Sequence, residues 1–332
     1  MGKKGAWRRE TERCIQQALD AAERSSALYI PSKRSTLNAC RRRCETGGLV
    51  EPQLGMFARL SFWKTLKPNV RALCILRGLQ AQHPKWVFCN ISAAAAYGLP
   101  VSVVHLNTSH VVFSVHTRLD GRLRVCGHVM TAIPVAQTMG LRVTSLSQTV
   151  LDCTCELSFC EALAVADACL RNYSISKAEL QAFVTQAGRG RHGIVNARRV
   201  LKYADGLSES WGESVARGLM IQLGFALPEL QAVIELPQSL GGSRRVDFLW
   251  RLPDGRIIIG EFDGKVKYRD KSMLGERDVV EVLVDERQRE SRLTVTRAAV
   301  VRFTYDDLRD PERFATLLNA YGVPRAGVRA AA

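Results

Sequence analysis

The sequence has 332 residues, of which 46% are hydrophobic and 24% are charged, and its formal net charge is +15. These proportions are ordinary for a globular protein, and the length predicts two or three domains. The first residues, "MGKKGAWRRETER", have no apolar core, and no run approaches the roughly 18 apolar residues of a membrane span. The pattern predicts no secretory signal, no membrane span and a cytoplasmic location.

The positive charge is distributed unevenly along the chain. Residues 1–75 contain 15 Lys and Arg against 6 Asp and Glu, residues 76–205 contain 13 against 7, and residues 206–332 contain 19 against 19. A basic surplus confined to the first two thirds indicates a polyanionic partner, and we expect double-stranded DNA. The alternative is a basic protein that its charge merely keeps soluble.

Residues 1–75 have the order of a winged helix-turn-helix domain. Apolar residues at helical spacing predict a helix over 9–23, and Pro31 breaks the chain after it. A second, basic helix, "TLNACRRRCET", is expected to be capped by Ser35 and to end at Gly47. The strand-like residues and turns of "LVEPQLGMFARLSFW" then predict a small β-ribbon.

Four arginines lie on or beside the second helix and are predicted to contact DNA. They are Arg34, Arg41, Arg42 and Arg43. Consecutive arginines cannot all face one groove, because neighbouring residues of a helix point in different directions. The alternative is a basic helix that is simply solvated.

Residues 76–205 are predicted to form an α+β domain, with an Ala-rich helix, short β-rich segments and then further helices. The β-rich part contains His105, His110, His116 and His128 without HxH or HxxxH spacing, so we interpret them as structural or surface groups. The ten cysteines of the chain form no CxxC pair. Buried free thiols are therefore expected rather than a structural zinc site.

Residues 206–332 are predicted to form an α/β domain with a mixed sheet. Strands are expected around "RRVDFLW" and "RIIIGEFDG", and the turn residues Pro253-Asp254-Gly255 between them indicate a hairpin. A hairpin centred on Asp254 places Asp247 opposite Glu261 and Arg245 opposite Asp263.

Opposed carboxylates repel each other unless a cation lies between them. Residues 206–332 contain neither His nor Cys, so a metal ion there must have oxygen ligands, as Mg²⁺ or Mn²⁺ prefers. Asp247, Glu261 and Asp263, with Lys265 at the edge, are predicted to bind such an ion and to hydrolyse phosphodiester bonds. The alternative is that these charges occupy the solvent-facing side of a hairpin.

The stretch "RVDFLW…IIIGEFDGKVKY" resembles the core of the PD-(D/E)XK nuclease superfamily, and more closely the domain related to very-short-patch-repair endonucleases that is common in actinobacterial proteins. The flanking "ESWGESVARGLMIQLGFALPELQ" and "DERQRESRL…AAVVRFTYDDL" match as well. The resemblance implies roles for seven residues: the metal-site acids Glu213, Asp247, Glu261 and Asp263, the motif lysine Lys265, and the supporting helix pair Glu286 and Arg289. Val246 stands where the motif has Pro. Asp263, not Glu261, has the strict spacing to Lys265, so either acid fills the second motif position.

The first 200 residues resemble the actinobacterial relatives of the AbiEi-type antitoxin of type IV abortive-infection systems. The matching pieces are "CETGGLVEPQLGMFAR", "NISAAAAYGLPV" and "GLRVTSLSQTVLD". This resemblance implies DNA binding and autoregulation, and it leaves a cognate toxin open as a partner.

Together, the two resemblances predict a multidomain α/β protein. It has a winged helix-turn-helix over 1–75, an antitoxin-like α+β domain over 76–205 and a restriction-endonuclease-like domain over 206–332. Two functions follow: a Mg²⁺-dependent DNA endonuclease, or a non-catalytic antitoxin-like repressor with a degenerate nuclease fold. RNA also stays open as a substrate.

Overall fold

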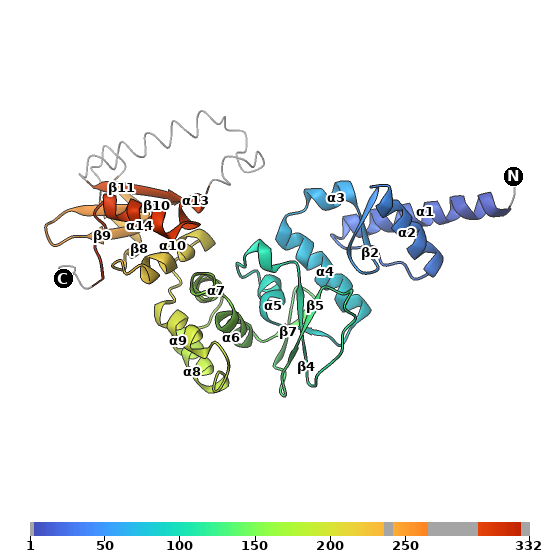
Figure 1. Ribbon diagram of the computed structural model, residues 1–332, viewed down its shortest axis with the longest axis horizontal. Coiled ribbons are helices and arrows are strands. Elements are labelled where there is room, and N and C mark those ends of the chain that lie inside the picture. Colours follow the sequence, from blue (N-terminus) through green and yellow to red (C-terminus); the bar gives the residue numbers. More distant parts are fainter. Residues whose placement is uncertain (1–2, 236–241, 265–297, 327–332) are drawn as a thin grey trace, which may run out of the picture. The chain divides into compact units, whose positions relative to one another are not determined.

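The computed structural model describes residues 3–235, 242–264 and 298–326. The chain divides into two compact units, Met1–Cys153 and Thr154–Ala332, and both combine helices with a sheet (Figure 1). The expected multidomain α/β class with mixed sheets is confirmed, whereas the three domain boundaries stay predictions. Lys265, Glu286 and Arg289 lie outside the described residues. No described helix is long and apolar enough to cross a membrane.

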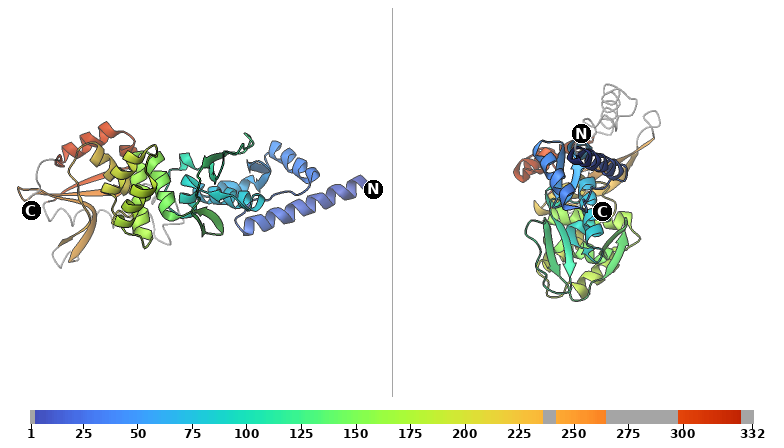
Figure 2. Two further views of the ribbon diagram at one scale, coloured as in Figure 1. Left: turned by 90° about the horizontal axis from the view of Figure 1, so that it is seen from below. Right: turned by 90° about the vertical axis from the view of Figure 1, so that its right-hand side faces the viewer.

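The first unit begins with two helices and a two-stranded hairpin. These elements are α1 (Lys3–Arg24), α2 (Arg34–Glu45), β1 (Leu49–Gln53) and β2 (Met56–Arg59). Figure 2 shows α1 as one unbroken helix. Between the helices, Tyr29 forms an isolated antiparallel bridge with Phe57 of β2. The expected cap at Ser35 is wrong, because α2 already begins at Arg34, and Lys33 at its N-cap makes no side-chain hydrogen bond.

A five-stranded mixed sheet forms the rest of the first unit, in the order β5-β4-β3-β7-β6. The strands of this sheet are β3 (Val87–Phe88), β4 (Ser109–Phe113), β5 (Val125–Val129), β6 (Val135–Thr138) and β7 (Leu141–Thr144). The helices in this part of the chain are α3 (Leu60–Thr65), α4 (Pro68–Gln82), α5 (Asn90–Ala96), η1 (Val103–His105) and α6 (Leu146–Glu156). The core lies between the sheet and helices α4 and α5, where Leu79, Phe88, Ala93 and Val143 are buried together.

Helices follow α6 in the second unit. They are α7 (Phe159–Asn172), α8 (Lys177–Ala187), α9 (Ile194–Tyr203) and α10 (Trp211–Gln222). Ser158, Ser176 and Ser210 each accept a hydrogen bond from the backbone N–H three residues later, which satisfies a free donor of the first turn. Helix α7 packs closely on α10 at Gly218, where a side chain would not fit: a Cβ there would lie 2.9 Å from the sulfur of Cys160.

A four-stranded mixed sheet follows, in the order β11-β10-β9-β8. The strands of this sheet are β8 (Glu229–Glu235), β9 (Ser243–Arg251), β10 (Ile257–Asp263) and β11 (Ala299–Thr304). Two helices follow β11, namely α13 (Tyr305–Leu308) and α14 (Pro311–Ala320). Phe248, Phe303 and Phe314 pack in sequence, with ring centroids 5.7 and 5.2 Å apart. This packing holds α14 on the same face of the sheet as the Phe248 side chain.

Candidate functional site

The register of the hairpin β9–β10 is the one expected from its turn, but the ladder ends early. Four pairs form, from Ile257 opposite Arg251 to Gly260 opposite Phe248. Beyond Gly260, the N–H of Phe262 donates to the carboxylate of Asp247 over 2.9 Å. The expected direct pairing of Asp247 with Glu261 is therefore wrong, because the Asp247 side chain takes the backbone donor of the separating strand.

The same separation removes the expected pairing of Arg245 with Asp263. Asp263 lies opposite Thr304 of β11 in the parallel ladder, and it is half-buried. Arg245 instead forms an ion pair with Glu209 just before α10, with a nitrogen–oxygen distance of 2.8 Å. Arg245 and Asp263 thus have different neighbours. Asp263 is the last residue of β10.

Glu213 and Asp247 are the two predicted metal-site acids that the structure brings together. Glu213 lies in the first turn of α10, where it is 8% exposed. Its Oε2 accepts hydrogen bonds from the N–H of Glu209 (2.8 Å) and from Nε2 of Gln231 (3.0 Å). Burial raises the pKa of Glu213, and the neighbouring charge of Asp247 raises it further. A proton or a cation at this pair would relieve the repulsion.

Glu261 points away from this pair. Successive residues of a strand point to opposite faces, so Glu261 and Phe262 face opposite ways. Phe262 contacts α10 so closely that a Cβ at Gly212 would overlap its ring. Glu261 therefore lies on the face turned away from α10, where it forms an ion pair with Arg244 over 3.4 Å. Among the described residues, no three of the four predicted acids have carboxylate oxygens that lie within 4.8 Å of one another.

The raised pKa of Glu213 predicts a pH dependence of stability. Its protonated form is favoured in the folded state, so its contribution is fully present below the unfolded value near 4.5 and is lost as the pH rises through the folded value. Each pKa unit corresponds to about 1.4 kcal/mol. We expect Glu213→Gln to become more stable relative to wild type as the pH rises from 4.5 to 7, measured by urea unfolding. A Glu235→Gln variant, changed at an exposed carboxyl, should show no such trend.

Of the four predicted DNA-binding arginines, two are exposed and two form ion pairs within the protein. Arg34 and Arg42 are exposed on α2. Arg41 is held by Glu51 of β1 through nitrogen–oxygen distances of 3.2 and 3.3 Å. Arg43 is held by Glu12 of α1 and also donates to the carbonyl of Ala39. The exposed side of α2 thus carries Arg34, Asn38 and Arg42, which are spaced four residues apart.

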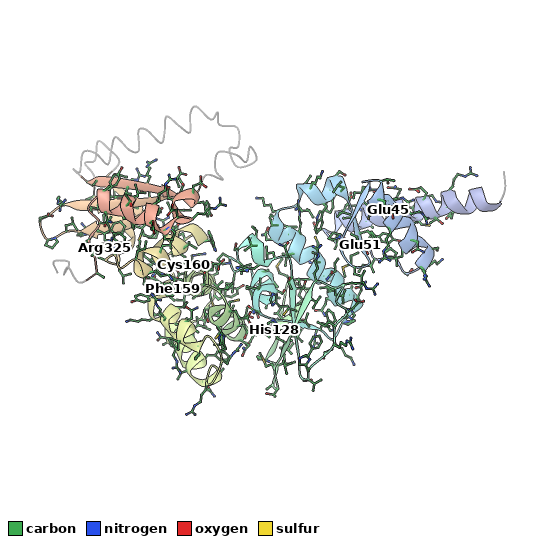
Figure 3. The ribbon with its side chains drawn as sticks, in the orientation of Figure 1. Glu45, Glu51, His128, Phe159, Cys160 and Arg325 are labelled. Carbon is green, nitrogen blue, oxygen red and sulfur yellow. The ribbon has the colours of Figure 1, made fainter. Side chains whose placement is uncertain are left out.

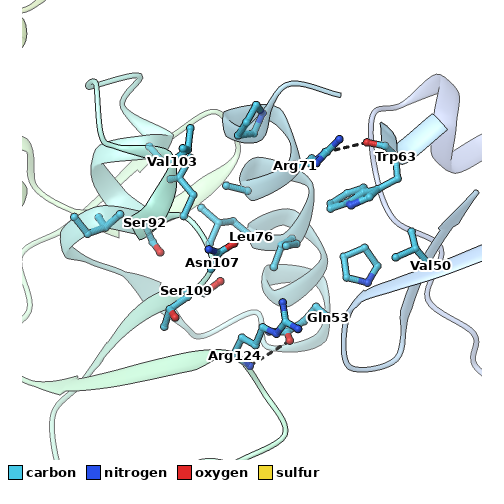
Figure 4. A pocket seen from close by; sticks show the side chains of 18 of the residues that line it. Val50, Gln53, Trp63, Arg71, Leu76, Ser92, Val103, Asn107, Ser109 and Arg124 are labelled. Carbon is cyan, nitrogen blue, oxygen red and sulfur yellow. Dashed lines mark hydrogen bonds between the residues drawn. The ribbon is translucent and has the colours of Figure 1, made fainter. Parts of the chain in front are cut away.

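A cavity of about 410 Å³ lies between hairpin residues, α4 and the segment before β4 (Figure 4). Gln53 lines it and is 3% exposed, and its Nε2 is buried with no hydrogen-bond partner among the described residues. Arg71 stands at the wall, 5.5 Å above the Trp63 ring, and Arg124 is also part of the lining. A cavity with an amide donor and two cations suits a small ligand that carries an oxygen acceptor.

Three side chains that the sequence did not predict to bind a metal lie close together in the first unit. His110, Cys126 and His128 offer ligand atoms that lie within 4.8 Å of one another. The interpretation of both histidines as merely structural or surface groups rested on the missing HxH and HxxxH spacings. The useful signal was the Cys126-Gly-His128 stretch, because residues two apart on a strand share a face.

Comparison with known proteins gives relatives rather than an activity. No family model matches the chain. It is 35% identical over 224 residues to the uncharacterized proteins MT2308 and Rv2248 from two strains of Mycobacterium tuberculosis. The aligned part covers 64% of this chain and 73% of each relative. The chain belongs to the family of these two mycobacterial proteins. Because both relatives are described as uncharacterized, membership brings no substrate or partner with it.

Proposed function

We propose that the protein binds double-stranded DNA through α2, in the manner of a winged-helix or antitoxin-like regulator. The observation that carries this proposal is the exposed row of Arg34, Asn38 and Arg42. Residues at i, i+4 and i+8 lie on one side of a helix. Arg and Asn are also the side chains that pair with two atoms of guanine and adenine in the major groove.

The charge distribution supports the same proposal. The surplus of positive charge lies in residues 1–205, and the last 127 residues, 206–332, are neutral overall. A basic field attracts the phosphate backbone irrespective of sequence, whereas contacts in the groove select the site. The hairpin β1–β2, which directly follows α2, occupies the place in the chain order that a wing has in winged-helix proteins.

A double replacement on α2 tests the proposal. Each arginine that contacts a phosphate contributes about 0.9 to the slope of log affinity against log salt, so Arg34→Ala with Arg42→Ala should lower this slope by up to about 1.8. DNA affinity at physiological salt should fall at least about tenfold. The measurement is fluorescence anisotropy of a labelled duplex titrated with the full-length protein at several salt concentrations.

Arg41→Ala with Arg43→Ala is the matched control, since it removes the same formal charge from the same helix. These two side chains already serve Glu51 and Glu12, so we expect the salt slope to change by less than about one. Equal losses in both double variants would mean that net charge alone attracts DNA. Unchanged binding in the Arg34 and Arg42 variant would refute α2 as the contact helix.

A second candidate function is Mg²⁺- or Mn²⁺-dependent cleavage of the bound DNA by the second unit. The adjacent carboxylates of Glu213 and Asp247, where β9 and β10 separate, favour it. Their oxygens are the donor type that these ions prefer, and a bound ion would polarise a phosphate and activate a water. The PD-(D/E)XK resemblance makes Asp263 and Lys265 the further candidates of this site. Relaxation of supercoiled plasmid in Mg²⁺ is the direct assay.

The non-catalytic alternative, a repressor with a degenerate nuclease fold, rests on Glu261. If Glu261 fills the second motif position, it would have to reach the same ion as Asp247, and the Arg244–Glu261 ion pair would have to open first. DNA binding without cleavage is the outcome that this alternative expects. A cognate toxin would be a partner of the antitoxin-like first part, and RNA stays an alternative substrate of the nuclease-like part.

A further inference from the structure

The edge of the five-stranded sheet gathers three metal-ligating side chains. Strands β4 and β5 run parallel, with His110 opposite Cys126 and Val112 opposite His128. Positions 110, 126 and 128 therefore share one face of the two strands. Strand β5 lies at one edge of the sheet and has no fully buried residue, so the chain can be approached from solvent there. His128 is labelled in Figure 3.

The distances between the ligand atoms fit a single small ion. All three ligand atoms lie within 4.8 Å of one another, and Nδ1 of His110 is 2.9 Å from Nε2 of His128. Two nitrogens bound tetrahedrally to zinc at about 2.0–2.1 Å are about 3.3 Å apart. The imidazoles would have to separate by only about 0.4 Å, a movement within reach of small side-chain rotations.

We propose that His110, Cys126 and His128 form a binding site for Zn²⁺. Two imidazoles and one thiolate are the donor types of zinc sites, whereas Mg²⁺ and Mn²⁺ prefer oxygen. Three protein ligands leave one tetrahedral position for water or another small ligand. The site is chemically distinct from the carboxylate pair of the second unit, so it does not depend on the proposed functions.

The ion would also join β5 to the sheet. The five residues of β5 bury little side chain, with three exposed and two half-buried, so packing stabilises this strand weakly. A metal ion that binds ligands from both β4 and β5 would hold the edge strand to its neighbour. Metal binding to the folded state alone stabilises that state by mass action.

Cobalt titration of the full-length protein tests the site, because Co²⁺ reports zinc ligands by its colour. We expect one ion to bind per chain, with tetrahedral ligand-field bands and a sulfur-to-cobalt charge-transfer band that Zn²⁺ then abolishes. An excess of Mg²⁺ in the buffer keeps the carboxylates of the second unit from contributing. The charge-transfer band of the wild-type protein shows thiolate ligation without any variant.

Cys126→Ser should remove the charge-transfer band, and His128→Gln should weaken Co²⁺ and Zn²⁺ binding by more than about 100-fold, since even an outer-shell partner is worth about 10–100-fold. Cys14→Ser and His116→Gln, which alter exposed residues of the same unit, are the matched controls and should bind both ions normally. A wild-type protein without the band would overturn the site. The site would also be overturned if the Cys126→Ser variant still bound Co²⁺ with an intact charge-transfer band. Either result would leave His110 and His128 as a hydrogen-bonded pair.

Discussion

Arg217→Met is expected to lower the free energy of unfolding by about 3–5 kcal/mol, because it leaves a buried carboxylate without its cation. Asp167 of α7 is fully buried, and both of its oxygens accept hydrogen bonds from Arg217 of α10, at 2.7 and 2.8 Å. Arg217 also donates to the carbonyl of Tyr203 over 2.6 Å. Urea unfolding of the full-length protein measures the loss.

The control for this change is an ion pair at the surface of the same unit. Arg245→Met breaks the exposed pair with Glu209 and should cost less than about 1 kcal/mol. Adding Asp167→Asn to Arg217→Met should recover part of the loss, since the amide is neutral and its oxygen still accepts from the N–H of Asp205. Equal costs for Arg217→Met and Arg245→Met would show that the buried pair does not hold α7 to α10.

Asp247→Asn is expected to abolish Mg²⁺-dependent cleavage of plasmid DNA, by at least about 100-fold, while DNA affinity stays within about twofold of wild type. The charge of this carboxylate acts on Glu213 and would act on the ion, whereas binding is assigned to α2 in the other unit. Nicking rates in Mg²⁺ and Mn²⁺, measured beside anisotropy with the same DNA, separate the two effects.

Asp254→Asn makes the same chemical change in the exposed turn of the same hairpin, and its nicking rate should equal that of wild type. If wild type binds DNA and nicks nothing in either ion, the non-catalytic repressor is the correct function. If Asp247→Asn nicks as fast as wild type, the Glu213–Asp247 pair is not the site. Both results leave the α2 proposal intact, because that proposal is tested by affinity alone.

Local chemistry was enough to predict several elements from the sequence. The Pro253-Asp254-Gly255 turn predicted the hairpin and its register, since a short turn fixes which residues of the two strands meet. The alternation and length of the apolar runs likewise predicted a mixed sheet flanked by helices in residues 206–332. The basic helix was expected to begin at Thr36, two residues later than it does, which is the usual uncertainty where no side chain caps a helix.

Contacts between distant residues decided the rest. The ion pairs of Arg41 and Arg43 depend on Glu51 and Glu12, which other elements bring to α2, and no sequence pattern within the helix predicts them. Glu261 was expected beside Asp247, but the Asp247 carboxylate ended the ladder by accepting the Phe262 N–H. His110 lies 16 residues before Cys126, and only the parallel pairing of β4 with β5 makes them neighbours. A sequence pattern reports the face on which a residue lies, whereas the side chain that meets it there is set by tertiary packing.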